Sequence, residues 1–121
     1  MFKYELHAHT AECDKCAKLG GAELVSAYAE KGYSGIVITD HYFSGFYSWL
    51  ADEIGDEHSS IIDRYLAGYR AARAEGEKIG FTVLPGAEVR IDGEINDYLV
   101  YGLCEEDFYA LPLLNRQKSI E

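Results

Sequence analysis

The stretch Ser34-Gly35-Ile36-Val37-Ile38-Thr39-Asp40 is an apolar run that ends in two polar residues. A run without polar alternation is typical of a strand that is buried on both faces, as in a parallel sheet. Before it, residues 22–31 carry apolar side chains at helical spacing, and Gly32 is suited to end that helix. A helix followed by a buried strand indicates an α/β protein.

The flanking sequence adds further elements to this unit. We expect strands at residues 2–6, 81–84 and 97–103, a long helix at 57–78, and a turn at Asp92-Gly93. The aromatic stretch 43–54 is expected to be irregular, with one or two helical turns, and residues 104–121 are weakly patterned. The order strand, helix, strand, helix, strand, strand predicts a mostly parallel sheet. All 121 residues are assigned to one domain.

Composition excludes several classes of protein. Ten Tyr and five Phe in a chain that is 48% hydrophobic provide a core, so disorder is excluded as the main state. The sequence has no apolar run near the roughly 20 residues of a membrane span, and its first residues do not resemble a signal peptide. We therefore expect a cytoplasmic protein without membrane contact, whose three cysteines are reduced. The net charge of −10 disfavours nucleic acid as a partner and fits cation binding.

Histidines and acids stand where the expected strands end. His7 and His9 follow the first strand, Asp40 and His41 end the buried strand, and Glu88 follows the third. Because the carboxyl ends of parallel strands meet at one edge, these side chains are expected to converge. Imidazoles two positions apart lie on one side of a strand and could chelate a divalent ion. Glu88 could bridge this ion and a second ion. Asp40 would either orient His41 or ligate directly.

Each pattern has an ordinary explanation when it is taken alone. Thr39-Asp40-His41, for example, could be a helix cap followed by a surface histidine, but the patterns together favour a metal site. Cys13-Asp14-Lys15-Cys16 lacks the context of a redox or zinc motif, and His58 is interpreted as part of a solvated helix start. The aromatic residues between 42 and 49 either line a substrate pocket or pack in a core or interface, and packing is the favoured interpretation.

Three motifs resemble those of the polymerase and histidinol phosphatase (PHP) family. They are His7-Ala8-His9-Thr10, Thr39-Asp40-His41 and Gly86-Ala87-Glu88, and the resemblance covers most of residues 3–103. It implies a distorted β/α barrel with two or three divalent metals at the carboxyl ends of its strands. It also implies hydrolysis of a small phosphorylated substrate, in a manner similar to histidinol phosphatase.

The resemblance also implies roles for single residues. His7 and His9 would hold one metal, Glu88 would bridge two, and His41 would hold a third together with a residue of the loop that follows Thr10. Asp97 stands where the family often has a metal-binding histidine.

Two candidates remain open for the loop residue. Asp14 fits when residues are counted forward from the first motif, and Cys16 fits better when they are counted back from residues 23–25. A thiolate would favour zinc, which is the expected metal, with manganese and iron as alternatives. Glu88 and Arg90 are the expected catalytic residues, since Arg90 could neutralise a phosphate.

The chain lacks the later motifs of the family. We therefore expect a partial barrel with an open strand edge, covered by another chain such as a second copy. The leading expectation is a metal-dependent phosphoesterase. The alternatives are an inactive or truncated metal-binding module that needs a partner chain, and a small α/β domain that binds no metal.

Overall fold

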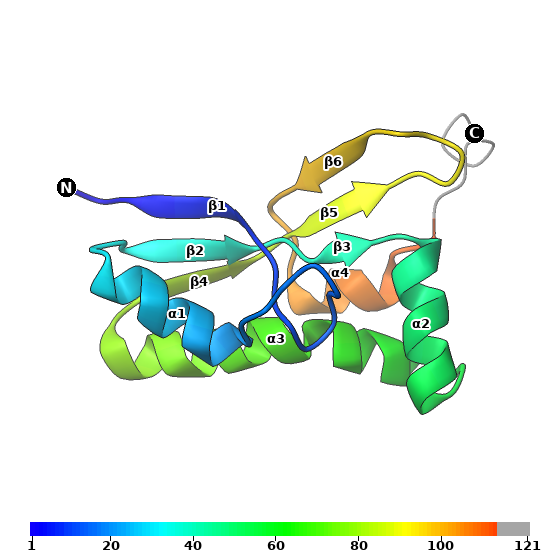
Figure 1. The fold of residues 1–121 in the computed structure, drawn as a ribbon, viewed down its shortest axis with the longest axis horizontal. Coiled ribbons are helices and arrows are strands. Elements are labelled where there is room, and N and C mark those ends of the chain that lie inside the picture. The colour runs from blue at the N-terminus through cyan, green and yellow to red at the C-terminus, as the bar shows by residue number, and fades with distance from the viewer. Residues whose placement is uncertain (114–121) are drawn as a thin grey trace.

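The structure, a computed structural model, describes residues 1–113 (Figure 1). Its strands form two three-stranded sheets, with the orders β1-β2-β4 and β3-β5-β6. In chain order the elements are β1 (Tyr4–Ala8), α1 (Gly21–Glu30), β2 (Gly35–Ile38), β3 (His41–Tyr42), α2 (Ser44–Ile54), α3 (His58–Ile79), β4 (Thr82–Pro85), β5 (Ala87–Arg90), β6 (Asp97–Val100) and α4 (Glu105–Ala110). The predicted α/β class, with parallel strands, is confirmed.

The first sheet is parallel and has the predicted buried strand at its centre. β2 pairs in parallel with β1 on one side and β4 on the other, and all four of its residues are buried. The helices α1 and α3 lie along the same face of this sheet (Figure 1). Gly32 and Gly80 follow these helices with φ values of 86° and 73°, which favour glycine, so the predicted helix ends are confirmed.

The second sheet begins where the first ends. β3 follows β2 after only Thr39 and Asp40, and β5 follows β4 after Gly86. β5 pairs in parallel with β3 and antiparallel with β6. Glu88 follows the predicted third strand, as expected, but it lies in a separate strand, β5, which the sequence did not predict. The break falls at Gly86, where a Cβ atom would lie 2.9 Å from the Val100 carbonyl oxygen.

Two helices depart from the sequence prediction. The stretch expected to be irregular forms α2, an 11-residue helix, because Phe46 and Leu50 lie one turn apart and are both buried in the core. The weakly patterned tail contains α4, whose first turn is capped by a bond from the Cys104 backbone N–H to Asp107 Oδ2 at 2.8 Å. Phe108 anchors α4 with a fully buried side chain. The end of that tail, residues 114–121, lies outside the described residues.

The strands of residues 1–113 do not close into a barrel. Apolar side chains remain about half exposed on the outer strands, including Tyr4 and Leu6 of β1, Leu84 of β4 and Tyr98 of β6. Both sheets therefore have uncovered edges. No helix in the described part of the chain is long and apolar enough to cross a membrane.

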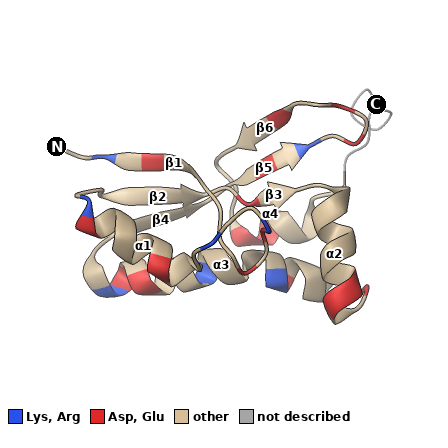
Figure 2. Cartoon of the chain, viewed as in Figure 1, with Lys and Arg blue, Asp and Glu red and all other residues tan. Residues whose placement is uncertain are grey.

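Charged residues are distributed unevenly over these elements. Of the helices, α3 carries both signs and the others carry only acidic residues, whereas β2 and β4 carry no charged residue (Figure 2). Acidic residues occur in β5 and β6, where Glu88 and Asp97 lie. The acids of the second sheet thus lie beyond the carboxyl ends of the first.

Candidate metal centre

The two histidines of the first motif lie on the same side of the chain. His7 is in β1, where the register with β2 shifts between Glu5 and Ala8, and His9 follows that strand directly. Their Nε2 atoms are 3.2 Å apart. The His9 side chain is 15% exposed and that of His7 is 48% exposed, so the pair faces solvent from one side only.

Glu88 lies at the centre of the cluster. Its position in β5 pairs with His41 in β3, and its side chain is buried. Oε1 lies 2.6 Å from His7 Nε2, whereas Oε2 contacts His41 Nε2 and lies 3.6 Å from His9 Nε2. The two oxygens of one carboxylate thus face imidazoles from different sheets.

Asp14 reaches the cluster from the loop between β1 and α1. Its backbone N–H donates to the Thr10 carbonyl at 3.1 Å. Oδ2 lies 3.0 Å from His9 Nδ1 and 2.8 Å from His41 Nδ1, and it accepts the His41 backbone N–H at 3.0 Å. Burial alone would raise the pKa of Asp14, but the hydrogen bonds from His41 and His9 hold it well below its ordinary value.

This contact fixes the tautomers of two histidines. An ionised carboxylate only accepts hydrogen bonds, so Nδ1 of both His9 and His41 must carry a proton. The same bond raises the pKa of His41. In their neutral forms, both rings then have an unprotonated Nε2 on the side of Glu88, where a cation between this nitrogen and the Glu88 carboxylate would be held in a carboxylate–histidine–metal arrangement.

Asp97 and Arg90 close the cluster on the side of β6. Asp97 Oδ2 lies 3.9 Å from His41 Nε2. The same carboxylate accepts hydrogen bonds from Arg90 Nε and Nη2 at 2.6 and 2.9 Å. Arg90 holds the pKa of Asp97 below its ordinary value, and Asp97 raises that of Arg90.

The cluster divides into three overlapping groups whose donor atoms lie within 4.8 Å of one another. They are His7, His9 and Glu88; His9, Asp14 and His41; and His41, Glu88 and Asp97. In the middle group, Asp14 accepts hydrogen bonds from Nδ1 of His9 and of His41, so we assign it an orienting role. The other two groups present imidazole nitrogens and carboxylate oxygens, which suit divalent zinc, iron or manganese, and Glu88 belongs to both. The donor set therefore fits two cations that share Glu88.

The structure does not bring every candidate ligand into these groups. Asp40 lies outside them, because its carboxylate accepts hydrogen bonds from Thr10 N and Oγ1 at 2.5 and 2.7 Å. Burial raises the pKa of Asp40 to about 6, against the effect of the Thr10 bonds. Cys16 also lies outside the groups; its backbone N–H donates to Asp14 Oδ1 at 2.9 Å. Desolvation and the charge of Asp14 raise the pKa of the Cys16 thiol.

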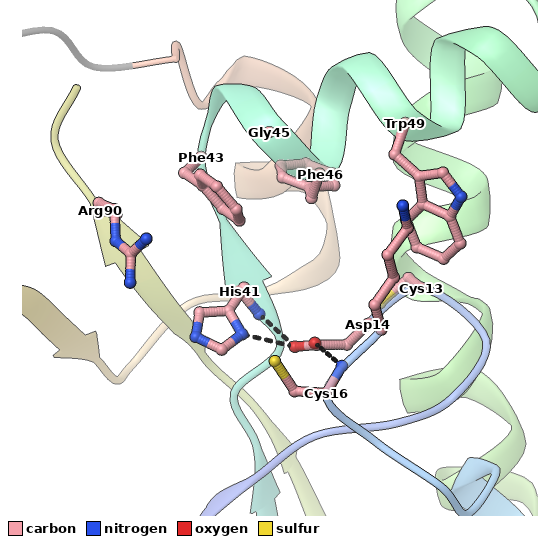
Figure 3. Close-up of a pocket in the computed structure, with 10 residues that line it drawn as sticks. Cys13, Asp14, Cys16, His41, Phe43, Gly45, Phe46, Trp49 and Arg90 are labelled. Carbon is pink, nitrogen blue, oxygen red and sulfur yellow. Dashed lines mark hydrogen bonds and ion pairs between the residues drawn. The ribbon is translucent and has the colours of Figure 1, made fainter.

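A pocket of about 290 Å³ opens beside the cluster and shares Asp14 and His41 with it (Figure 3). Phe43, Phe46 and Trp49 form an aromatic wall, while Tyr42 is buried in the core. The other lining residues are Cys13, Lys15, Cys16, Gly45 and Arg90. Sequence reasoning missed Lys15 and Gly45, because Lys15 is not one of the cysteines considered in Cys13-Asp14-Lys15-Cys16 and Gly45 belongs to no motif.

His58 has a structural environment apart from the cluster. Its Nδ1 lies 2.7 Å from the Tyr47 hydroxyl and its Nε2 lies 3.0 Å from the Tyr109 carbonyl oxygen. It therefore connects the start of α3 to α2 and α4. All three cysteines are free thiols, and Cys13 alone is buried.

No protein-family model matches the chain, and no curated protein matches it either. The function proposed for this chain therefore rests on the donor atoms of the cluster and on the pocket beside them.

Proposed function

We propose that the chain is a metal-dependent phosphoesterase of the PHP type, and that its strands form part of that family's distorted barrel. The observation that carries the proposal is the position of Glu88, with Oε1 at 2.6 Å from His7 Nε2 and Oε2 against His41 Nε2. A carboxylate that faces two sets of imidazoles is suited to bridge two cations. Zinc is the preferred metal, because imidazole is abundant in the donor set.

The electrostatics of the cluster support bound cations. Asp14, Glu88 and Asp97 gather around three imidazoles, and Arg90 is the one guanidinium paired with them in residues 1–113. Two of these carboxylates, Asp14 and Glu88, are buried. Buried carboxylates in excess are costly unless cations compensate them.

Different residues of the chain would have different roles in phosphoester hydrolysis. Two bound divalent cations would lower the pKa of water toward about 7 and neutralise phosphoryl oxygens. Glu88 would belong to both metal sites, and Asp14 would keep the histidines in the ligating tautomer. Arg90 uses Nε and Nη2 for Asp97, which leaves Nη1 to donate to a phosphate oxygen at the edge of the pocket.

The test is metal content by elemental analysis together with turnover of a generic phosphomonoester. We expect close to two divalent cations per chain in the wild type, and loss of metal with at least a hundredfold loss of turnover in His7→Ala and Glu88→Gln. His58→Ala is the matched control, because this histidine lies outside the donor groups. Unchanged metal stoichiometry in both His7→Ala and Glu88→Gln would refute the assignment.

A second candidate is a metal-binding module that acts only with a partner chain, such as a second copy. The half-exposed apolar residues on β1 and β6 favour it, since they leave a surface for another chain to cover. Stoichiometric metal without turnover, in protein shown to be folded, would support this candidate over the first.

A further inference from the structure

The pocket beside the donor groups has one wall made of rings. Phe43 precedes α2, and Phe46 and Trp49 follow in that helix, so one short segment supplies all three (Figure 3). His41 and Asp14 form the side that faces the donor groups. A molecule whose phosphate lies at the cluster would therefore extend its organic part along this aromatic wall.

Two of these rings, Phe43 and Trp49, pack partly against the core and also lie beside basic side chains at the pocket. Lys15 Nζ lies 4.8 Å from the centre of the Trp49 ring, and the Arg90 guanidinium carbon lies 5.2 Å from the centre of the Phe43 ring. Both cations also line the pocket. Phe46, in contrast, is 4% exposed and belongs to the core. The packing interpretation thus holds for Phe46 and in part for Phe43 and Trp49, which are partly buried against the core and also line the pocket.

We propose that this pocket selects phosphoesters whose organic group carries an aromatic ring, a specificity that rests on the proposed phosphoesterase activity. Its volume of about 290 Å³ is at the lower end for ligand pockets, which leaves room for one ring system. An aromatic group gains offset or edge-to-face contacts with Phe43 and Trp49 that an aliphatic chain cannot make. Phe43 and Trp49 are then the residues that determine specificity.

Binding can be measured without turnover, because Trp49 is the only tryptophan in the chain. Zinc-loaded protein is titrated with 2-phenylethylphosphonate and with n-butylphosphonate, and intrinsic fluorescence is recorded. We expect a saturable change for the phenyl compound, with a Kd about three- to tenfold lower than that of the butyl compound. Equal affinities, measured for both ligands by calorimetry, would overturn the proposal.

Turnover gives the second measurement. 2-Phenylethyl phosphate and n-butyl phosphate are both esters of primary alcohols, so their ratio of kcat/KM reports the pocket rather than the leaving group. We expect a ratio of about three to ten in the wild type, and roughly two or less in Phe43→Leu and Trp49→Leu. Phe2→Leu, which removes an exposed ring outside the pocket, should keep the wild-type ratio.

The outcomes separate the two proposals. Equal turnover of both esters would overturn the specificity and leave the phosphoesterase standing. Hydrolysis of neither ester by metal-loaded protein would overturn both. Two leucine variants are used so that one remains informative if the other fails to fold, and an unchanged ratio in folded variants would count against the pocket.

Discussion

A single carboxylate decides which nitrogens of the cluster can bind metal. Asp14 accepts from Nδ1 of His9 and of His41, so their Nε2 atoms are left for ligation. Cys16, four residues before the end of the same loop, contributes only its backbone N–H to this arrangement. Of the two loop candidates, Asp14 forms hydrogen bonds with the histidines and the Cys16 side chain lies outside the donor groups, and we propose that Asp14 acts through these histidines.

This assignment predicts different results for two substitutions in the loop. Asp14→Ala should weaken metal binding by about 10–100-fold without lowering the stoichiometry at saturating metal, because it removes an orienting group and no ligand. Cys16→Ala should leave the affinity unchanged. Both are measured by competition with a chromogenic chelator. Loss of one cation per chain in either variant would show that the residue is a ligand.

Much of this cluster follows from the sequence, because polar residues at the ends of parallel strands converge whatever the details of packing. His7, His9, His41 and Glu88 could be chosen on that ground. The role of Asp14 could not, since it depends on how a loop folds. The position of Asp40 could not either, because the Thr10 bonds that draw it away from the metal groups are tertiary contacts.

Tyr42 gives a prediction about pH. Burial raises the pKa of Tyr42 to about 12, and its hydroxyl donates to the Leu111 carbonyl at 2.6 Å. Because the folded-state pKa is above the unfolded value of about 10, the protonated ring contributes stability below pH 10, and this is lost as pH rises toward 12. Wild type should therefore lose about 2–3 kcal/mol more stability than Tyr42→Phe over this interval, since other buried tyrosines such as Tyr65 titrate in both proteins.

The measurement is urea unfolding at several pH values between 9 and 12, the interval set by these two pKa values. At neutral pH, Tyr42→Phe should be about 1 kcal/mol less stable through loss of the hydrogen bond. Parallel losses of stability in both proteins above pH 10 would contradict this role for Tyr42.

At the scale of elements, α3 supports the first motif through a very close contact. A Cβ atom at Gly68 would overlap Thr10 Oγ1, and one at Gly21 would overlap the Gly68 carbonyl oxygen. Thr10 in turn donates to Asp40, so the helix, the loop and the end of β2 are held together at this point. Glycine is needed here for space and not for its backbone conformation.

Gly68→Ala should therefore destabilise the fold by about 1–3 kcal/mol, although alanine is the better helix former. The displaced Thr10 should also weaken metal binding. The control is Ala74→Gly at an exposed position of α3, which should cost at most about 1 kcal/mol and leave metal affinity unchanged. Thermal unfolding and chelator competition measure both effects, and a Gly68→Ala protein as stable as wild type would contradict the contact.

The elements that the sequence predicted well are those with a clear apolar pattern. β2 is a continuous apolar run and α3 has apolar residues at helical spacing, and both were predicted within two residues of their ends. The full extent of α2 and the presence of α4 were not predicted. Each helix is stabilised by a few buried side chains, such as Leu50 and Phe108, and their burial depends on tertiary packing. The break between β4 and β5 was not predicted for the same reason. Glycine is needed at position 86 because the Val100 backbone lies close to it, and this is a tertiary contact.

For the whole molecule, bound cations should add stability to a chain of net charge −10. At metal concentrations about a hundredfold above Kd, binding contributes about 2.7 kcal/mol. Addition of excess chelator to purified protein should lower Tm by roughly 5 °C or more, as followed by differential scanning calorimetry. Glu88→Gln is the reference variant, and addition of chelator should lower its Tm only slightly. An unchanged wild-type Tm would favour the α/β domain that binds no metal.

The donor groups span the break between the two sheets, since His7 belongs to β1 whereas His41, Glu88 and Asp97 belong to β3, β5 and β6. Cations bound there would connect the two sheets, so the angle between the sheets would be linked to the affinity of the site for cations. Linkage is reciprocal. A molecule that binds the free edge of β6 and rotates the second sheet would therefore change the affinity of the site for cations. Bound cations would change the affinity for that molecule by the same factor.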